Sequence, residues 1–111
     1  MILASDLRIG NWVQRIGCPL QIVGIKGTDI WVEAKGVEIE YEFYDGFKPI
    51  ELTDEWLKKF GFVYSDFLES WSLNGIITLE LEAGGFFYDR FKIETVNQLQ
   101  NLYHALTGEE L

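Results

Sequence analysis

Hydrophobic and polar residues alternate in short runs over the first half of the chain. The clearest run covers residues 37–43, where apolar side chains at the odd positions alternate with Glu38, Glu40 and Glu42. A period of two is typical of a strand with one buried and one solvated face. Other strand-like runs occupy residues 11–13, 20–25, 30–35 and 48–52, and glycine-containing turns such as Asp45-Gly46 separate them. The run at 20–25 is apolar on both faces apart from Gln21 and Gly24.

These runs predict four or five short strands within residues 11–52. Such a series of short strands and tight turns indicates a small Greek-key or SH3-like β-barrel, and it fits an open meander equally well.

The pattern changes at Thr53, where the first helix is expected. Thr53 suits the N-cap position, Asp54 and Glu55 favour the positive end of the helix, and Gly61 suits a left-handed stop. Residues 62–93 then return to strand-like runs with turn signals at Asn74-Gly75 and Gly84-Gly85. We expect a three-stranded antiparallel meander in this segment.

A second helix is expected from Thr95 to Gly108. Thr95 and Gln98 have the spacing of a capping box, and Gly108 is a natural C-terminal stop. Val96, Leu99, Tyr103 and Leu106 follow at spacings of three and four, which makes one apolar stripe that should lie across the meander. The predicted fold class is therefore α+β. Residues 1–111 are expected to form a single compact domain, with two possible lobes at 1–52 and 53–111.

Three blocks of sequence carry a family resemblance. They are Leu-Arg-Ile-Gly-Asn-Trp-Val at 7–13, Pro-Ile-Glu-Leu-Thr-Asp-Glu-Trp-Leu-Lys-Lys-Phe-Gly-Phe at 49–62, and Val-Asn-Gln-Leu-Gln-Asn-Leu-Tyr-His-Ala-Leu-Thr-Gly-Glu-Glu-Leu at 96–111. The chain resembles a family of small uncharacterised bacterial proteins that are often encoded in prophage or mobile-element neighbourhoods. The resemblance implies a phage or mobile-element accessory protein, and it brings no catalytic residue, ligand or cofactor with it.

Charge and composition narrow the class of partner. Eighteen acidic against nine basic side chains give a formal charge of −9, which repels a nucleic-acid backbone. The single cysteine, Cys18, can form no internal disulfide, and the N-terminus lacks the basic and apolar segments of a signal peptide. We expect a cytoplasmic protein that does not associate with membranes.

Catalytic and metal-binding chemistry is not indicated. Successive carboxylates on one strand face, such as Glu38, Glu40 and Glu42, lie about 6.6 Å apart, so they do not converge on one ion unless another strand contributes, such as the one carrying Glu80 and Glu82. The only histidine, His104, lacks a recognisable nucleophile or orienting group. We expect no enzymatic activity, no metal and no cofactor.

Aromatic residues near these strands suggest a binding surface instead. Trp31 lies on the polar face of its predicted strand, Trp12 is expected to flank it in the first strand, and Tyr44 follows the acidic run. Exposed aromatic side chains often anchor interfaces, although a covering layer such as the helix from Thr53 would give them a structural role.

The leading hypothesis is a non-enzymatic protein-interaction module that binds an unidentified protein or a second copy of itself through Trp31, Trp12, Tyr44, Glu38, Glu40 and Glu42. One alternative is an acidic decoy that imitates nucleic acid and occupies a DNA-binding protein. The other, disfavoured by the net charge, is a small-barrel protein that binds nucleic acid on aromatic platforms.

Overall fold

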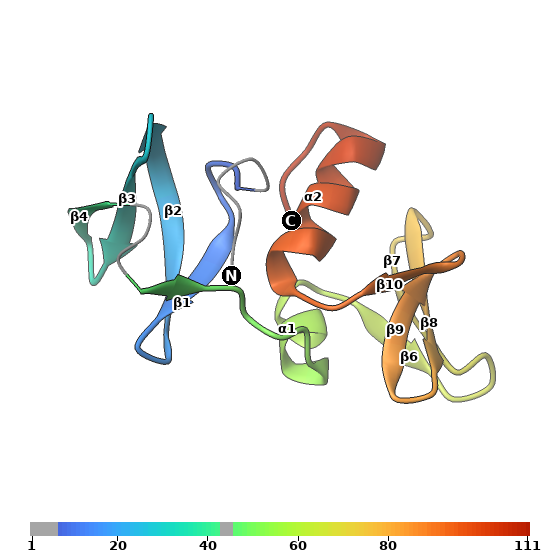
Figure 1. Ribbon diagram of the computed structural model, residues 1–111. Helices are drawn as coiled ribbons and strands as arrows, with labels where there is room; N and C mark the ends of the chain where they lie inside the picture. Colours follow the sequence, from blue (N-terminus) through green and yellow to red (C-terminus); the bar gives the residue numbers. More distant parts are fainter. Residues whose placement is uncertain (1–6, 43–45) are drawn as a thin grey trace.

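The protein is an α+β structure in which two antiparallel five-stranded sheets flank two helices, as the computed structural model in Figure 1 shows. The structure describes residues 7–42 and 46–111. The predicted α+β class is confirmed. Over the described residues neither sheet closes into a barrel, so the N-terminal strands form the open meander rather than a closed barrel.

The N-terminal sheet has the strand order β4-β3-β2-β1-β5, because the last strand returns to pair with the first. Two-residue turns at Ile16-Gly17 and Lys35-Gly36 join neighbouring strands, with both residues of each turn at positive φ, as tight hairpins require. The strands are β1 (Trp12–Arg15), β2 (Cys18–Lys26), β3 (Asp29–Ala34), β4 (Val37–Glu42) and β5 (Phe47–Lys48).

The inner face of this sheet has its own hydrophobic cluster. Its buried members are Leu7, Val13, Ile22, Ile30, Val32 and Phe47. Tyr41 of β4 packs edge-on against Phe47 of β5, with ring centroids 5.4 Å apart. The guanidinium of Arg15 lies 4.6 Å from the centre of the same tyrosine ring. Side chains therefore connect the two ends of a sheet whose backbones do not pair.

The first helix, α1 (Asp54–Lys59), has the expected boundaries. Thr53 occupies the N-cap with an extended backbone, although its side chain makes no capping hydrogen bond. Gly61 has φ +94°, and Phe62 N–H donates to the Leu57 carbonyl at 3.0 Å, as in a Schellman stop. Leu57 is fully buried and fixes the helix on the C-terminal core.

The predicted three-stranded meander at residues 62–93 is wrong, because this segment forms five strands. Asp89 at φ +55° and Arg90 make a two-residue turn that divides the expected strand 86–93 into a hairpin. A further turn at residues 66–69, in which Glu69 has φ +48°, separates the first two strands. In sequence order the strands are β6 (Val63–Ser65), β7 (Ser70–Leu73), β8 (Ile77–Glu82), β9 (Gly85–Tyr88) and β10 (Phe91–Ile93).

The second helix, α2 (Val96–Thr107), begins and ends as the sequence predicts. Thr95 and Gln98 form the capping box, and Gly108 closes the helix in a left-handed conformation with φ 76°. Val96, Leu99 and Tyr103 lie in the hydrophobic cluster of the C-terminal sheet, whereas Leu106 remains 45% exposed. The apolar stripe of α2 therefore covers the second sheet over most of its length.

The opposite side of α2 faces the first sheet and contacts it through polar groups. Gln100 is 1% exposed, and its amide spans two backbone groups next to β1. Its Nε2 donates to the Gly10 carbonyl at 2.9 Å, and its Oε1 accepts from Trp12 N–H at 2.8 Å. A single side chain therefore takes the place of a neighbouring strand at this point of the sheet.

Further polar contacts extend this connection along α2. Asn11, fully buried, donates from Nδ2 to Asn101 Oδ1 at 3.0 Å. Arg8 donates from Nε to the same oxygen at 2.9 Å and pairs with Glu110 beyond the helix. We call the contacts of Arg8, Gly10, Asn11 and Trp12 with Gln100, Asn101 and Glu110 the polar seam.

Replacing Gln100 should lower the free energy of unfolding more than replacing an exposed glutamine on the same helix. Gln100→Ala leaves the part-buried Trp12 N–H without its acceptor, while the Gly10 carbonyl keeps a second donor, Gln21 Nε2 at 3.1 Å. We expect a loss of about 2–3 kcal/mol in the free energy of unfolding, measured by urea denaturation. Gln98→Ala, which removes an exposed half of the capping box, is the comparator and should cost roughly 0.3–1.5 kcal/mol. A smaller loss for Gln100→Ala than for Gln98→Ala would contradict the seam.

Candidate functional site

The outer face of the N-terminal sheet places Trp31 between a glycine and a glutamate. Trp31 of β3 is opposite Gly24 of β2 and opposite Glu40 of β4. A Cβ atom added to Gly24 would lie 3.4 Å from Cε3 of the tryptophan, so the ring rests on the glycine backbone. The bulge in β2 between Ile22 and Gly24 brings this glycine opposite the ring. Trp31 is consequently half-buried and held in place by the sheet itself.

Carboxylates surround the tryptophan on the same face. The register of β3 and β4 pairs Asp29 with Glu42 and Glu33 with Glu38, and Glu40 lies opposite Trp31. All three β4 glutamates are exposed, as is Glu33. We call this surface the acidic tryptophan face; it consists of Asp29, Trp31, Glu33, Glu38, Glu40 and Glu42.

Two of the cross-strand pairs on this face bring like charges together. Residues directly opposite in an antiparallel sheet have Cβ atoms about 4.5–5.5 Å apart, and like charges at that distance are destabilising. The pairs Asp29–Glu42 and Glu33–Glu38 both have this arrangement. Lys26 of β2 lies opposite Asp29 and offsets part of this charge, so the face keeps an excess of carboxylates.

The carboxyl group of Glu40 shows the effect of this crowding. Partial desolvation raises the pKa of Glu40 above its ordinary value of 4.5, and a hydrogen bond to Asp29 together with repulsion from its charge raises that pKa further. The Lys26 ammonium acts in the opposite direction and lowers the pKa. The carboxyl group of Asp29 therefore acts directly on that of Glu40, next to the tryptophan ring.

Trp12 belongs to the same side of the sheet but is covered. It pairs with Gln21, which in turn pairs with Glu33, so its register places it on the outer face. Its ring packs against Trp56 of α1, with centroids 5.5 Å apart. The Lys59 ammonium lies 4.2 Å from the centre of the Trp12 ring. Trp12 and Trp31 therefore lie on one side of the sheet, but α1 covers the β1 half of this face, which is the covering layer that the sequence analysis held open.

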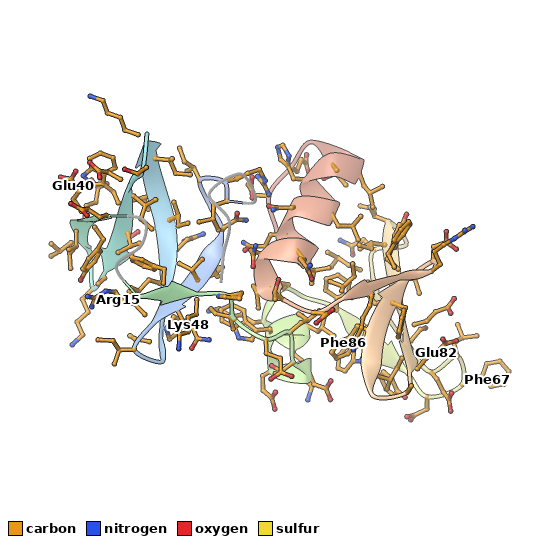
Figure 2. All side chains as sticks on the ribbon, in the orientation of Figure 1. Arg15, Glu40, Lys48, Phe67, Glu82 and Phe86 are labelled. Carbon is orange, nitrogen blue, oxygen red and sulfur yellow. The ribbon has the colours of Figure 1, made fainter. Side chains whose placement is uncertain are left out.

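The other residues that the sequence suggested for a site lie in different parts of the molecule. Glu38, Glu40 and Glu42 lie on the strand next to Trp31, whereas Tyr44 lies outside the described residues. Glu80 and Glu82 belong to β8 of the second sheet. Figure 2 shows Glu40 and Glu82 at opposite ends of the molecule, so the two groups of glutamates do not form one cluster.

Other reactive groups are scattered over the described residues. No three His, Cys, Asp or Glu side chains in residues 7–42 and 46–111 are placed to hold a metal ion. His104 is half-buried on α2, and Cys18 is an exposed free thiol at the start of β2. The strongest grouping of chemically similar side chains in the described part is the acidic tryptophan face.

The sequence contained a signal for this face that the strand pattern alone did not use. A two-residue turn at Lys35-Gly36 fixes the register of β3 and β4, and the register brings Glu33 opposite Glu38. The expected strand at 30–35 included Lys35, which concealed the turn. Sequence analysis also missed Asp29 and Gly24, whose roles depend on pairing across strands.

Comparisons with known proteins leave the site to be interpreted from its geometry. No family model, no curated protein and no solved structure matches the chain. Among the described residues, no helix is long and apolar enough to cross a membrane.

The pKa of Glu40 tests the arrangement directly. Titration of its side-chain carboxyl by NMR should give a midpoint above 4.5. Asp29→Asn should lower this midpoint, and Lys26→Gln should raise it, because the two neighbours act in opposite directions.

The raised pKa of Glu40 determines how its contribution to the stability of the fold changes with pH. Between 4.5 and the raised pKa the folded protein binds more protons than the unfolded chain, so the contribution of Glu40 to stability falls as pH rises through that interval. A Glu40 midpoint that neither substitution moves would show that the three groups are not neighbours in solution.

Proposed function

We propose that this protein is a non-enzymatic interaction module whose acidic tryptophan face binds a basic segment of a protein partner. The observation that carries the proposal is the position of Trp31 among five carboxylates on the half of the sheet that α1 leaves uncovered. Figure 1 shows β3 and β4 on the side of the first sheet that lies away from both helices.

A basic side chain matches this face in two ways. A guanidinium or ammonium group over a tryptophan ring gains about 0.5–2 kcal/mol, more when the contact excludes water. The same group can pair with Glu40 opposite the ring or with Asp29 and Glu33, the next residues on the same face of β3. Binding would also remove the repulsion within the like-charge pairs.

The same charges weigh against direct binding of nucleic acid. Phosphate groups approaching Trp31 would meet carboxylates on β3 and β4, and the net charge of −9 adds to the repulsion. The decoy hypothesis remains compatible with the face, because it differs only in making the basic partner a DNA-binding protein. A phage or mobile-element setting is likewise a proposal that rests on the sequence resemblance.

The finer description of the N-terminal sheet as SH3-like is also a proposal. It is supported by the meander β1 to β4, by the return of β5 to pair with β1, and by the contact of Tyr41 with Phe47 between the two ends of the sheet. These features would make the acidic tryptophan face the outer surface of a partly closed small barrel.

Binding of a flexible basic peptide tests the proposal. The probe is a fluorescently labelled decapeptide of alternating Arg and Gly, followed by anisotropy at two salt concentrations. We expect the peptide to bind with an affinity that falls as the salt concentration rises. Trp31→Ala should weaken this binding about fivefold to tenfold, because the cation–π contact is lost. Neutralising Glu38, Glu40 and Glu42 together to Gln should weaken it at least as much.

Matched variants separate the local site from the net charge. A triple variant removes the same number of charges from the second sheet, where three glutamates lie close together. Its substitutions are Glu69→Gln, Glu80→Gln and Glu82→Gln. Phe67→Ala removes a 94% exposed aromatic ring from the turn between β6 and β7. Both controls should bind the peptide nearly as well as the unmodified protein. Equal weakening by the two sets of glutamate substitutions would reject the proposed site.

A further inference from the structure

We propose that the basic partner binds as an extended strand added to the free edge of β4, with alternating basic and apolar side chains. This inference rests on the proposed function, and it adds the conformation and the side-chain pattern of the bound segment. Addition of a strand to a sheet edge is a common mode of peptide recognition, in which backbone hydrogen bonds supply affinity and side chains supply specificity.

The edge of β4 is long, and no strand among the described residues pairs with it. β4 ends the first sheet in the order β4-β3-β2-β1-β5, and it has six residues. The opposite edge, β5, has two residues and is followed by Pro49, which cannot donate a backbone hydrogen bond. The edges of the second sheet, β6 and β10, have three residues each. Among the described strands β4 therefore presents the longest edge for pairing, about 20 Å at 3.3 Å per residue.

The two faces of β4 specify the pattern of the added strand. On the outer face, Glu38, Glu40 and Glu42 form a row of exposed carboxylates. On the inner face, Val37 is 60% exposed and Ile39 is 37% exposed, so apolar surface continues beyond the core to the edge. A strand beside β4 would place every second side chain against the carboxylates and the others against Val37 and Ile39.

Charge decides between a second copy and a basic partner. Two β4 strands paired in the antiparallel sense would bring Glu38, Glu40 and Glu42 of each copy onto one face, opposite the same residues of the other. Like charges across strands are destabilising, and charged edges are a common protection against self-pairing. A strand with Lys or Arg at these positions meets opposite charges instead. The charges therefore disfavour pairing of β4 with β4 of a second copy, and they favour pairing with a basic segment.

The test uses three peptides that share one sequence and one charge. The parent is an acetylated and amidated octapeptide of alternating Val and Lys. In the second peptide the backbone nitrogen of every Val is methylated. In the third peptide the backbone nitrogen of every Lys is methylated, and the side-chain ammonium groups are unchanged. In a strand, alternate residues direct their N–H groups toward the same neighbour, so strand addition requires one set of amides and leaves the other free. Affinities for the full-length protein are measured by calorimetry.

We expect one methylated peptide to bind at least tenfold more weakly than the parent, and the other to stay within about threefold of it. Val37→Thr with Ile39→Thr, which keeps β-branched side chains in the strand, should weaken the parent peptide several-fold and leave the Arg-Gly peptide unchanged. Both effects would support strand addition at β4.

Other outcomes separate the two proposals. If both methylated peptides bind like the parent and Trp31→Ala still weakens all three, the strand addition is wrong and the acidic tryptophan face stands. If neither Trp31→Ala nor the glutamate substitutions weaken any peptide, the proposed function fails as well. Self-association of the protein that the β4 substitutions abolish would overturn the choice of a basic partner.

Discussion

The structure depends on the amide of Gln100, which holds α2 against the first sheet. This side chain donates to Gly10 and accepts from Trp12, so it satisfies backbone groups that would otherwise need a further strand. The two hydrophobic clusters lie on either side of it, one under each sheet. Because a buried polar group without a partner is costly, the seam holds the two sheets in one orientation more specifically than apolar contact would.

The seam also determines which surfaces remain available. β1 is occupied by α2 through Gln100 and by α1 through the stack of Trp12 on Trp56. At the opposite end of the same sheet, β4 has no neighbouring strand on its outer edge within residues 7–42 and 46–111. The acidic tryptophan face and the free edge therefore adjoin, at the end of the first sheet farthest from the helices in Figure 1. One geometric constraint thus places the charge, the aromatic ring and the unpaired backbone together.

Local signals predicted the elements, and long-range pairing decided the rest. Alternation located β3 and β4 to within a few residues, an apolar run located β2, and capping chemistry located α2 from Thr95 to Gly108. Turns formed by Asp89 and Glu69 escaped prediction, since non-glycine residues at positive φ carry no strong sequence signal. Trp31 and its glutamates were found from alternation alone. The covering of Trp12 by the helix from Thr53 stayed an open alternative in the sequence, because it depends on packing between segments far apart in the chain.

The seam joins the sequence blocks at 7–13 and 96–111, and the stack of Trp12 on Trp56 adds the block at 49–62. The most direct test of its role is native-state hydrogen exchange of the Trp12 amide. The account predicts that this amide opens with the same free energy as the slowest amides of both sheets, because α2 must leave β1 before it can exchange. Exchange of Trp12 and the β1 amides at a much lower free energy, while the second sheet stays protected, would contradict it.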